Sequence, residues 1–188
     1  MELLIVLLVV FVLPAILVIL SYNRFVTQVA SIDAAWSGID VELQRRHDLV
    51  DNLVRTVAAY AEHERTTLEA VTRARSRAIQ AVDPDVPVDE QARAEDALTD
   101  GLSRLLAISE AMPDLKADAG FRQLQSQLVE IEDRITASRR LYNLEVAAYE
   151  RRRKAVPSNV VASLFNFGPR ELFEIQDAGA KHKAQVTW

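Results

Sequence analysis

The sequence predicts an all-α protein in which an N-terminal transmembrane helix continues into a long-helix antiparallel, up-and-down bundle. Three observations support this fold class. Residues 3–20 carry no charged or strongly polar side chain, which is typical of a membrane span. After residue 25, apolar residues recur at alternating steps of three and four, as in a helical seam. No segment of useful length alternates between polar and apolar residues, so the sequence does not predict strands.

The apolar run is expected to be an uncleaved anchor, with the transmembrane helix over residues 3–22. Its 18 residues span about 27 Å as a helix, close to the thickness of a hydrocarbon core. A cleaved signal peptide is the alternative, but only Glu2 precedes the run, and no A-x-A cleavage site follows it. Arg24, and further along Arg45 and Arg46, follow the span, which favours a cytoplasmic C-terminal domain in a single-pass protein.

The region after the span is expected to begin with one helix from Phe25 to about Ala81. It contains no proline and one glycine, and as a single rod it would be about 85 Å long. The polar exceptions in its apolar seam are Arg46, Glu64 and Thr67. Two prolines, at positions 84 and 87, end this helix because they oppose helical geometry.

Three further helices are expected. The second runs from about Asp89 to Ala111, with Asp89 as its N-cap, and the third from about Ala119 to Lys154, before Pro157. A short helix follows around Ser158–Phe165. We therefore expect a helical bundle over residues 23–165 and a C-terminal tail over residues 166–188, whose aromatic residues are suited to pack on the bundle.

Several motifs of this chain resemble the LemA family, in order along nearly its whole length. They are Tyr22-Asn23-Arg24-Phe25-Val26, Ala35-Trp36-Ser37-Gly38-Ile39-Asp40-Val41, Leu43-Gln44-Arg45-Arg46-His47-Asp48-Leu49-Val50, Asn52-Leu53-Val54, Tyr60-Ala61-Glu62-His63-Glu64, Pro113-Asp114-Leu115-Lys116-Ala117, Phe121 with Leu124-Gln125, Glu132, Arg139-Arg140-Leu141-Tyr142-Asn143, and Pro157-Ser158-Asn159-Val160-Val161-Ala162 with Phe165 and Phe173. The resemblance implies a single-pass protein of the bacterial cell membrane with a helical bundle. It implies little about chemistry, because the family has no established activity.

Two positions depart from the family pattern. Asp51 stands where the family usually has a proline, which suits an uninterrupted first helix. Glu150 stands where an asparagine often follows the tyrosine, which argues against an asparagine-specific role at that position.

The sequence favours a protein that is not an enzyme and that holds no cofactor or metal. Without cysteine, thiol nucleophiles, disulfide scaffolds and cysteine zinc sites are excluded. His63-Glu64 starts like a zinc-protease motif, but Thr67 takes the place of the second histidine. His47, with Asp48 and Asp51, is expected on a solvated helix face. No nucleophile elbow or phosphate-binding glycine loop is present.

Three charged residues are expected to set the register between helices. Arg46 and Glu64 fall on seam positions of the first helix, where an unpaired charge would be costly to bury, and Glu132 on the third helix is a candidate partner for Arg45 or Arg46. Two alternatives stay open at this stage. The long side chains can reach water along the helix surface, or the charges can form a functional site.

The basic run Arg151-Arg152-Arg153-Lys154 ends the third helix. A nucleic-acid or anionic-lipid patch is one interpretation. A solvated helix end is the favoured one, because the helix dipole favours cations there. With three long helices, this end would lie away from the membrane exit, and no nucleic-acid partner is expected.

The functional hypothesis rests on a stripe of apolar residues near the span: Val29, Ile32, Trp36, Ile39 and Leu43. The second helix is too short to cover it, so the tail, a bend in the first helix, an earlier start of the second helix, a second copy or a partner would have to do so. We expect a non-enzymatic, membrane-anchored scaffold or adaptor that contacts the lipid bilayer and either forms a homo-oligomer or binds partner membrane proteins. The alternative is a regulatory subunit of a membrane protease or signalling enzyme.

Overall fold

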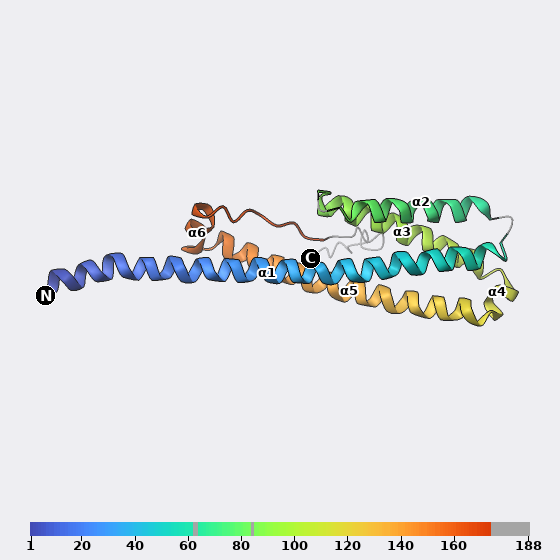
Figure 1. Ribbon diagram of the computed structural model, residues 1–188, viewed down its shortest axis with the longest axis horizontal. Coiled ribbons are helices and arrows are strands. Elements are labelled where there is room, and N and C mark those ends of the chain that lie inside the picture. The colour runs from blue at the N-terminus through green and yellow to red at the C-terminus, as the bar shows by residue number, and fades with distance from the viewer. Residues whose placement is uncertain (62–63, 84, 174–188) are drawn as a thin grey trace, which may run out of the picture. The chain divides into compact units, whose positions relative to one another are not determined.

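The computed structural model describes residues 1–61, 64–83 and 85–173, without the side chains of residues 3–10. All regular secondary structure in these ranges is helical, which confirms the predicted all-α class. The helices are α1 (Glu2–Ala58), α2 (Arg65–Ala81), α3 (Val88–Ser109), α4 (Pro113–Ala117), α5 (Ala119–Lys154) and α6 (Ser158–Leu164) (Figure 1).

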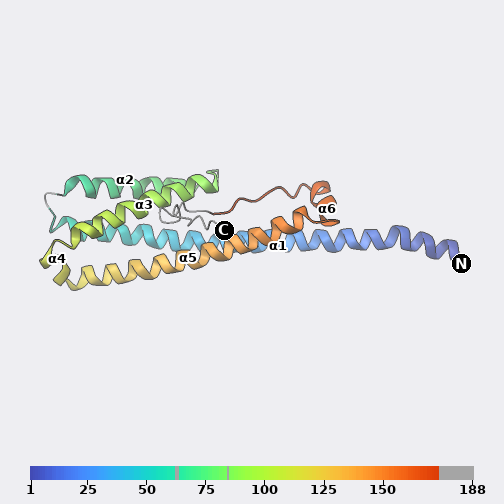
Figure 2. The ribbon, with the colours of Figure 1, turned by 180° about the vertical axis from the view of Figure 1, so that it is seen from behind.

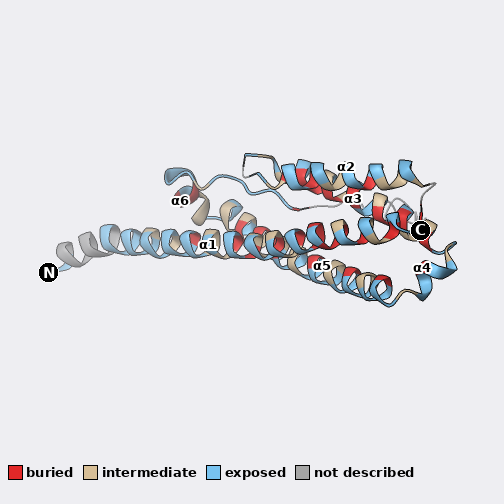
Figure 3. Ribbon diagram, turned by 45° about the vertical axis from the view of Figure 1, so that its right-hand side comes forward, coloured by how far each residue is buried: buried red, intermediate tan, exposed pale blue. Residues whose placement is uncertain are grey.

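The helix α1 carries the apolar N-terminal segment and continues without a break to Ala58. In the described part of the chain it is the one helix long and apolar enough to cross a membrane. Its side chains from Phe11 to Leu20 are almost all exposed in the single chain, and this part of the helix is pale blue in Figure 3. Apolar side chains that find no protein partner are suited to a lipid environment.

The expectation of one helix from Phe25 to Ala81 is wrong, because the chain reverses after Ala58. No glycine or proline causes the reversal; residues 59 and 60 form a turn, and the amide of the following Ala61 donates to the Val57 carbonyl at 2.9 Å. Folding back allows Val71 and Ala78 of α2 to join one core with Leu98 of α3. The burial of these side chains, rather than a local breaker, therefore determines the turn.

The helices belong to two compact units, described here separately. The central unit comprises residues 39–137 and Phe173, and the terminal unit comprises residues 1–38 and 138–172. The C-terminal part of α1 crosses into the central unit as one of its four long helices.

In the central unit, α1, α2, α3 and α5 form an up-and-down bundle. The helices α2 and α3 lie side by side as a hairpin in Figures 1 and 2. At Gly101 of α3 an added Cβ would lie 3.4 Å from the Val71 side chain of α2, so these helices approach closely there. The buried core residues are Leu49, Val50, Leu53, Val57, Ala61, Val71, Ala78, Leu98, Leu102, Leu105, Leu115, Phe121 and Leu128.

The helix α5 has the bounds that the sequence predicts. It begins after Asp118, whose Oδ1 accepts a hydrogen bond from the Phe121 amide at 2.8 Å, so that Asp118 acts as an N-cap. Pro157 follows its last residue by three positions. Local signals at both ends thus coincide with the boundaries of the packed element.

Candidate functional site

A buried charge cluster lies in the core of the central unit, around the guanidinium of Arg46 on α1. Its Nη2 donates to Oε2 of Glu95 on α3 at 2.8 Å and to the backbone oxygen of Glu95 at 2.9 Å. Its Nη1 donates to Oε1 of Glu132 on α5 at 2.8 Å and to Oγ1 of Thr99 at 3.2 Å. The Arg46 side chain therefore connects three helices.

The next residue, His47, extends this cluster to the fourth helix. Its Nε2 lies 2.8 Å from Oε1 of Glu95, so the two oxygens of one carboxylate are shared between Arg46 and His47. The backbone oxygen of His47 accepts a hydrogen bond from Nε of Arg75 on α2, at 2.7 Å. Nη1 of Arg75 also forms an ion pair with Asp51 at 3.5 Å. The cluster thus has a member or a direct contact on each long helix of the unit.

The burial of this cluster favours a structural role. The side chains of Arg46, His47 and Glu95 are each 1% exposed. Charges so deep in a protein are tolerated when they are paired, and loss of one partner costs about 3–5 kcal/mol. Because the groups are shielded from solvent, they are placed to hold helices together rather than to meet a substrate. A register role for these contacts stays a prediction.

The sequence interpretation names only part of the cluster. The sequence makes Glu132 a candidate partner for Arg45 or Arg46, and the structure places its side chain in hydrogen-bond contact with Arg46. His47 was expected on a solvated face, and this expectation is wrong: the residue is 0% exposed. Glu95 was not singled out, although it falls between Ala92 and Leu98 on the apolar face of α3. A charged residue at a core-facing position was the available signal.

Glu64 lies apart from the cluster. It stands at the N-cap position of α2, where its side chain is half-buried and makes no capping hydrogen bond. Of the three expected register residues, the described structure therefore brings together Arg46 and Glu132 alone. His63, beside Glu64, and His182 lie outside the described residues.

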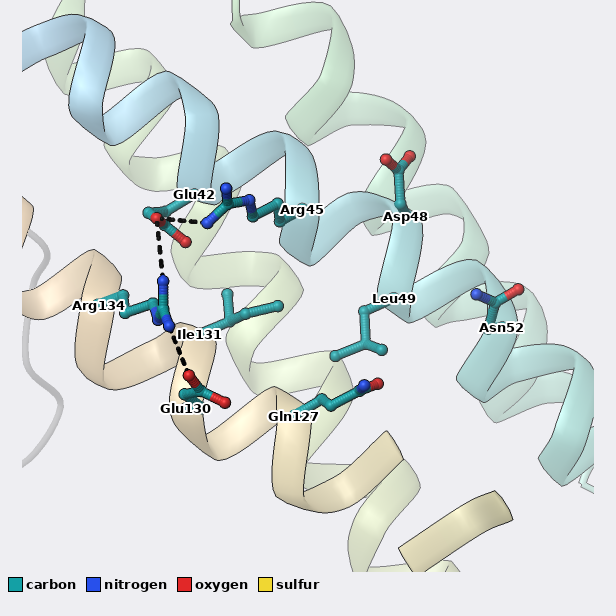
Figure 4. A pocket seen from close by; sticks show the side chains of 9 residues that line it. All are labelled: Glu42, Arg45, Asp48, Leu49, Asn52, Gln127, Glu130, Ile131 and Arg134. Atoms are coloured by element: carbon teal, nitrogen blue, oxygen red, sulfur yellow. Dashed lines mark hydrogen bonds and ion pairs between the residues drawn. The ribbon is translucent and has the colours of Figure 1, made fainter. Parts of the chain in front are cut away.

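A shallow groove of about 380 Å³ on the central unit is lined by charged side chains of α1 and α5. Figure 4 shows Arg134 between two carboxylates: its guanidinium lies 2.6 Å from Glu130 and 4.0 Å from Glu42. Arg45 also pairs with Glu42, at 2.9 Å. These charges compensate one another across the groove. In the part of the chain that the structure describes, no three His, Asp or Glu side chains come together as a metal site.

In the terminal unit, an aromatic cluster joins α1, α5 and the segment after α6. The ring of Phe25, which is fully buried, stacks on Phe167 at 4.8 Å and meets Tyr149 edge-to-face at 5.8 Å. Tyr22 meets the edge of Phe165 at 4.9 Å. The Tyr149 hydroxyl donates to the Gly168 carbonyl at 2.6 Å, which ties residues 165–168 to α5.

The basic C-terminal end of α5 lies beside the part of α1 where the apolar run ends. In this unit the two helices are antiparallel, because Trp36 contacts Tyr142 and Phe25 contacts Tyr149 further along α5. The expectation that residues 151–154 lie away from the membrane exit is therefore wrong. The turn after Ala58 adds one helix to the three long helices that the sequence predicts. As a result, α5 runs antiparallel to α1 rather than parallel to it.

The apolar stripe near the span is largely packed within the single chain. Ile32, Ile39 and Leu43 are at most 1% exposed, whereas Val29 and Trp36 are half-buried. The Trp36 ring meets Tyr142 edge-to-face at 5.1 Å. Residues of the same chain therefore cover Ile32, Ile39 and Leu43, which is one of the alternatives that the sequence leaves open. A binding role for this face stays a prediction that rests on Val29 and Trp36.

Comparison with known proteins gives one family and a small set of relatives. Residues 35–188 match the model of the LemA family. The chain is 27% identical to magnetosome protein MamQ 2 of Paramagnetospirillum magneticum and 26% identical to magnetosome protein MamQ of Magnetospirillum gryphiswaldense. Each alignment covers 86% of this chain and 67% of the relative. The names of these relatives place them with the magnetosome and state no reaction.

Proposed function

Since this chain belongs to the LemA family, we propose that it is a non-enzymatic, membrane-anchored helical scaffold that binds partner membrane proteins or further copies of itself. The chain is membrane-associated and helical, and the one candidate membrane helix among the described residues is also a core helix of the bundle. An anchor that is continuous with the bundle suits a protein that presents a surface at the membrane. The buried charge cluster, being shielded from solvent, supports a structural rather than a catalytic role.

The observation that carries the proposal is the pair of faces on α5. On one face Tyr142, Val146 and Tyr149 are at most 4% exposed within the terminal unit. On another, Leu141 and Leu144 lie one turn apart and are 53% and 60% exposed. Neighbouring exposed leucines on a helix whose other face is packed favour contact with another helix. We refer to Leu141 and Leu144 as the leucine face.

The leucine face can be tested with the full-length protein in a non-ionic detergent. Leu141→Gln/Leu144→Gln should lower the mass of the complex measured by light scattering, because polar side chains weaken an apolar contact. Val160→Gln is the matched control, since Val160 is also exposed, at 65%, but lies on α6. An unchanged mass and unchanged co-purifying membrane proteins in the double variant would overturn the proposal.

The half-buried residues Val29 and Trp36 of α1 form a second surface to test in the same assay. Trp36→Ala removes a half-buried ring, so loss of a binding partner must be separated from loss of stability. A partner lost at a temperature where circular dichroism shows the variant folded would support binding through this face. If the partner proves to be a membrane protease or signalling enzyme, its activity with and without this chain tests the role of a regulatory subunit.

A further inference from the structure

A groove of about 1070 Å³ runs between α1 and the C-terminal end of α5 in the terminal unit. Its volume is comparable to that of pockets that hold drug-sized ligands. Its α1 wall extends from Leu17 to Gln28, and its other wall is built from the end of α5 and the following Pro157 and Ser158. The groove therefore begins in the apolar run of α1 and continues past its end.

Three arginines line the groove, and no carboxylate does. They are Arg24 from α1 and Arg151 and Arg152 from α5. Within the described residues, none of the three has an Asp or Glu within ion-pair distance, whereas the neighbouring Arg153 and Lys154 both pair with Glu150. The acid on this part of α5 is thus bonded to residues outside the groove, and the positive charge of the groove is uncompensated.

The helix dipole does not account for this arrangement. A dipole favours cations at the end of α5, but it does so for Arg153 and Lys154, which do not line the groove, as well as for Arg151 and Arg152, which do. What distinguishes Arg24, Arg151 and Arg152 is that two different helices bring them to one cavity. Planar guanidinium groups bind phosphate oxygens in a bidentate geometry.

The polarity of the groove changes along α1 as it does across a membrane surface. Leu17 and Leu20 line its apolar end, and Arg24 follows Leu20 by one helical turn, about 6 Å along the axis. Between and beyond them, the buried oxygens Ser21 Oγ and Gln28 Oε1 have no hydrogen-bond partner in the described structure. A phospholipid is complementary to this sequence of groups. Its acyl chains can pack on the leucines, its phosphate can pair with the arginines, and hydroxyl groups of its headgroup are suited to hydrogen-bond Ser21 and Gln28.

We propose that this groove binds the headgroup of an anionic phospholipid from the bilayer that α1 enters. The lipid is phosphatidylglycerol-like, because its net negative charge offsets part of the charge of the three arginines and its glycerol hydroxyls are suited to hydrogen-bond Ser21 and Gln28, which line the groove. The bound lipid fixes the end of α5 to the membrane exit of α1. The site would act whether or not the leucine face binds a partner.

Full-length protein in non-ionic detergent, titrated with phosphatidylglycerol or phosphatidylcholine and followed by native mass spectrometry, tests this site. Wild-type protein should retain phosphatidylglycerol in preference to phosphatidylcholine. Each basic side chain near a membrane surface contributes about fivefold to anionic-lipid affinity, so Arg24→Gln alone should weaken binding about fivefold and Arg24→Gln/Arg151→Gln/Arg152→Gln roughly 100-fold. The single variant keeps the test informative if the triple variant does not fold.

Arg140→Gln is the matched control, because Arg140 is exposed on the same helix and lies outside the groove. Its affinity for phosphatidylglycerol should stay within about twofold of the wild type, since salt screens a distant charge. Equal retention of the two lipids, or an equal loss in Arg140→Gln and Arg24→Gln, would overturn the proposal. Inorganic phosphate that displaced the lipid at equal concentration would also overturn it, by showing a free-anion site instead.

Discussion

The charge of Arg46 is balanced in the core of the central unit by two carboxylates that differ greatly in burial. Glu95 is 1% exposed and serves both Arg46 and His47, whereas Glu132 is 38% exposed. Removing a buried partner leaves a charge without compensation, while a half-exposed partner can be replaced by water. The two glutamates should therefore differ in their contribution to stability.

We expect Glu95→Gln to lower the free energy of unfolding by about 3–5 kcal/mol. Glu132→Gln should lower it by about 1–2 kcal/mol, because water can take its place. Urea titrations of the full-length protein in detergent, followed by circular dichroism, measure both values. Glu130→Gln, which removes an exposed pair with Arg134, is the control and should change the value by less than about 1 kcal/mol. Equal losses for Glu95 and Glu132 would show that burial does not govern the cluster.

Asp40 of α1 gives a pH-dependent prediction. Burial raises the pKa of this carboxyl above its ordinary value of 3.8, and its Oδ1 has no hydrogen-bond partner in the described structure. The folded state therefore favours the protonated acid, and stability is lost as the pH rises through the raised pKa. Asp40→Asn should unfold at a higher temperature than the wild type at pH 7.

This advantage should shrink as the pH falls toward 3.8, where Asp40 is protonated in the folded wild type as well. Melting curves of both proteins across that pH range test the sign. Asp133→Asn, at an exposed position of α5, should give no comparable advantage at pH 7. A wild type that is more stable than Asp40→Asn at neutral pH would contradict the argument.

At the scale of the elements, local signals predict α5 fully and α1 only in part. The bounds of α5 follow from Asp118 and Pro157, which act on the backbone where they stand. The turn between α1 and α2 has no such marker, since helical periodicity continues across it. The sequence signal that accompanies the turn is a pair of polar residues, Glu64 and Thr67, at successive positions of the apolar seam. Its position depends on burial of α2 against α3, which periodicity does not show.

The segment after α6 depends on Phe25 for its packing. Phe25→Ala removes a fully buried ring that contacts Phe167 and Tyr149, so it should cost about 3–5 kcal/mol. Hydrogen exchange of residues 165–172 should become faster than in the wild type. Val26→Ala, at a 46% exposed neighbour, should leave exchange in this segment unchanged. Equal exchange in both variants would show that the aromatic cluster does not hold the segment.

At the scale of the whole molecule, the sequence predicts the all-α class, the apolar N-terminal helix and the LemA family, and all three are confirmed. It does not predict the direction of α5. The turn after Ala58, which no glycine or proline marks, adds one helix to the bundle and so reverses the direction of α5 relative to α1. The groove between α1 and α5 follows from that direction, and so do the positions of Arg151 and Arg152 beside Arg24. Residues that form this site are more than a hundred positions apart in the chain, so spacing does not reveal it.

The proposal of a membrane-anchored scaffold is tested most directly by photo-crosslinking in native membranes. A photoreactive amino acid replaces Leu144 of the full-length protein, and a second variant carries it at Val160 as the control. The account predicts a discrete adduct from position 144, either with a second copy of the chain or with one membrane protein, and none of that mass from position 160. Only uncrosslinked chain and lipid adducts at position 144 would contradict it.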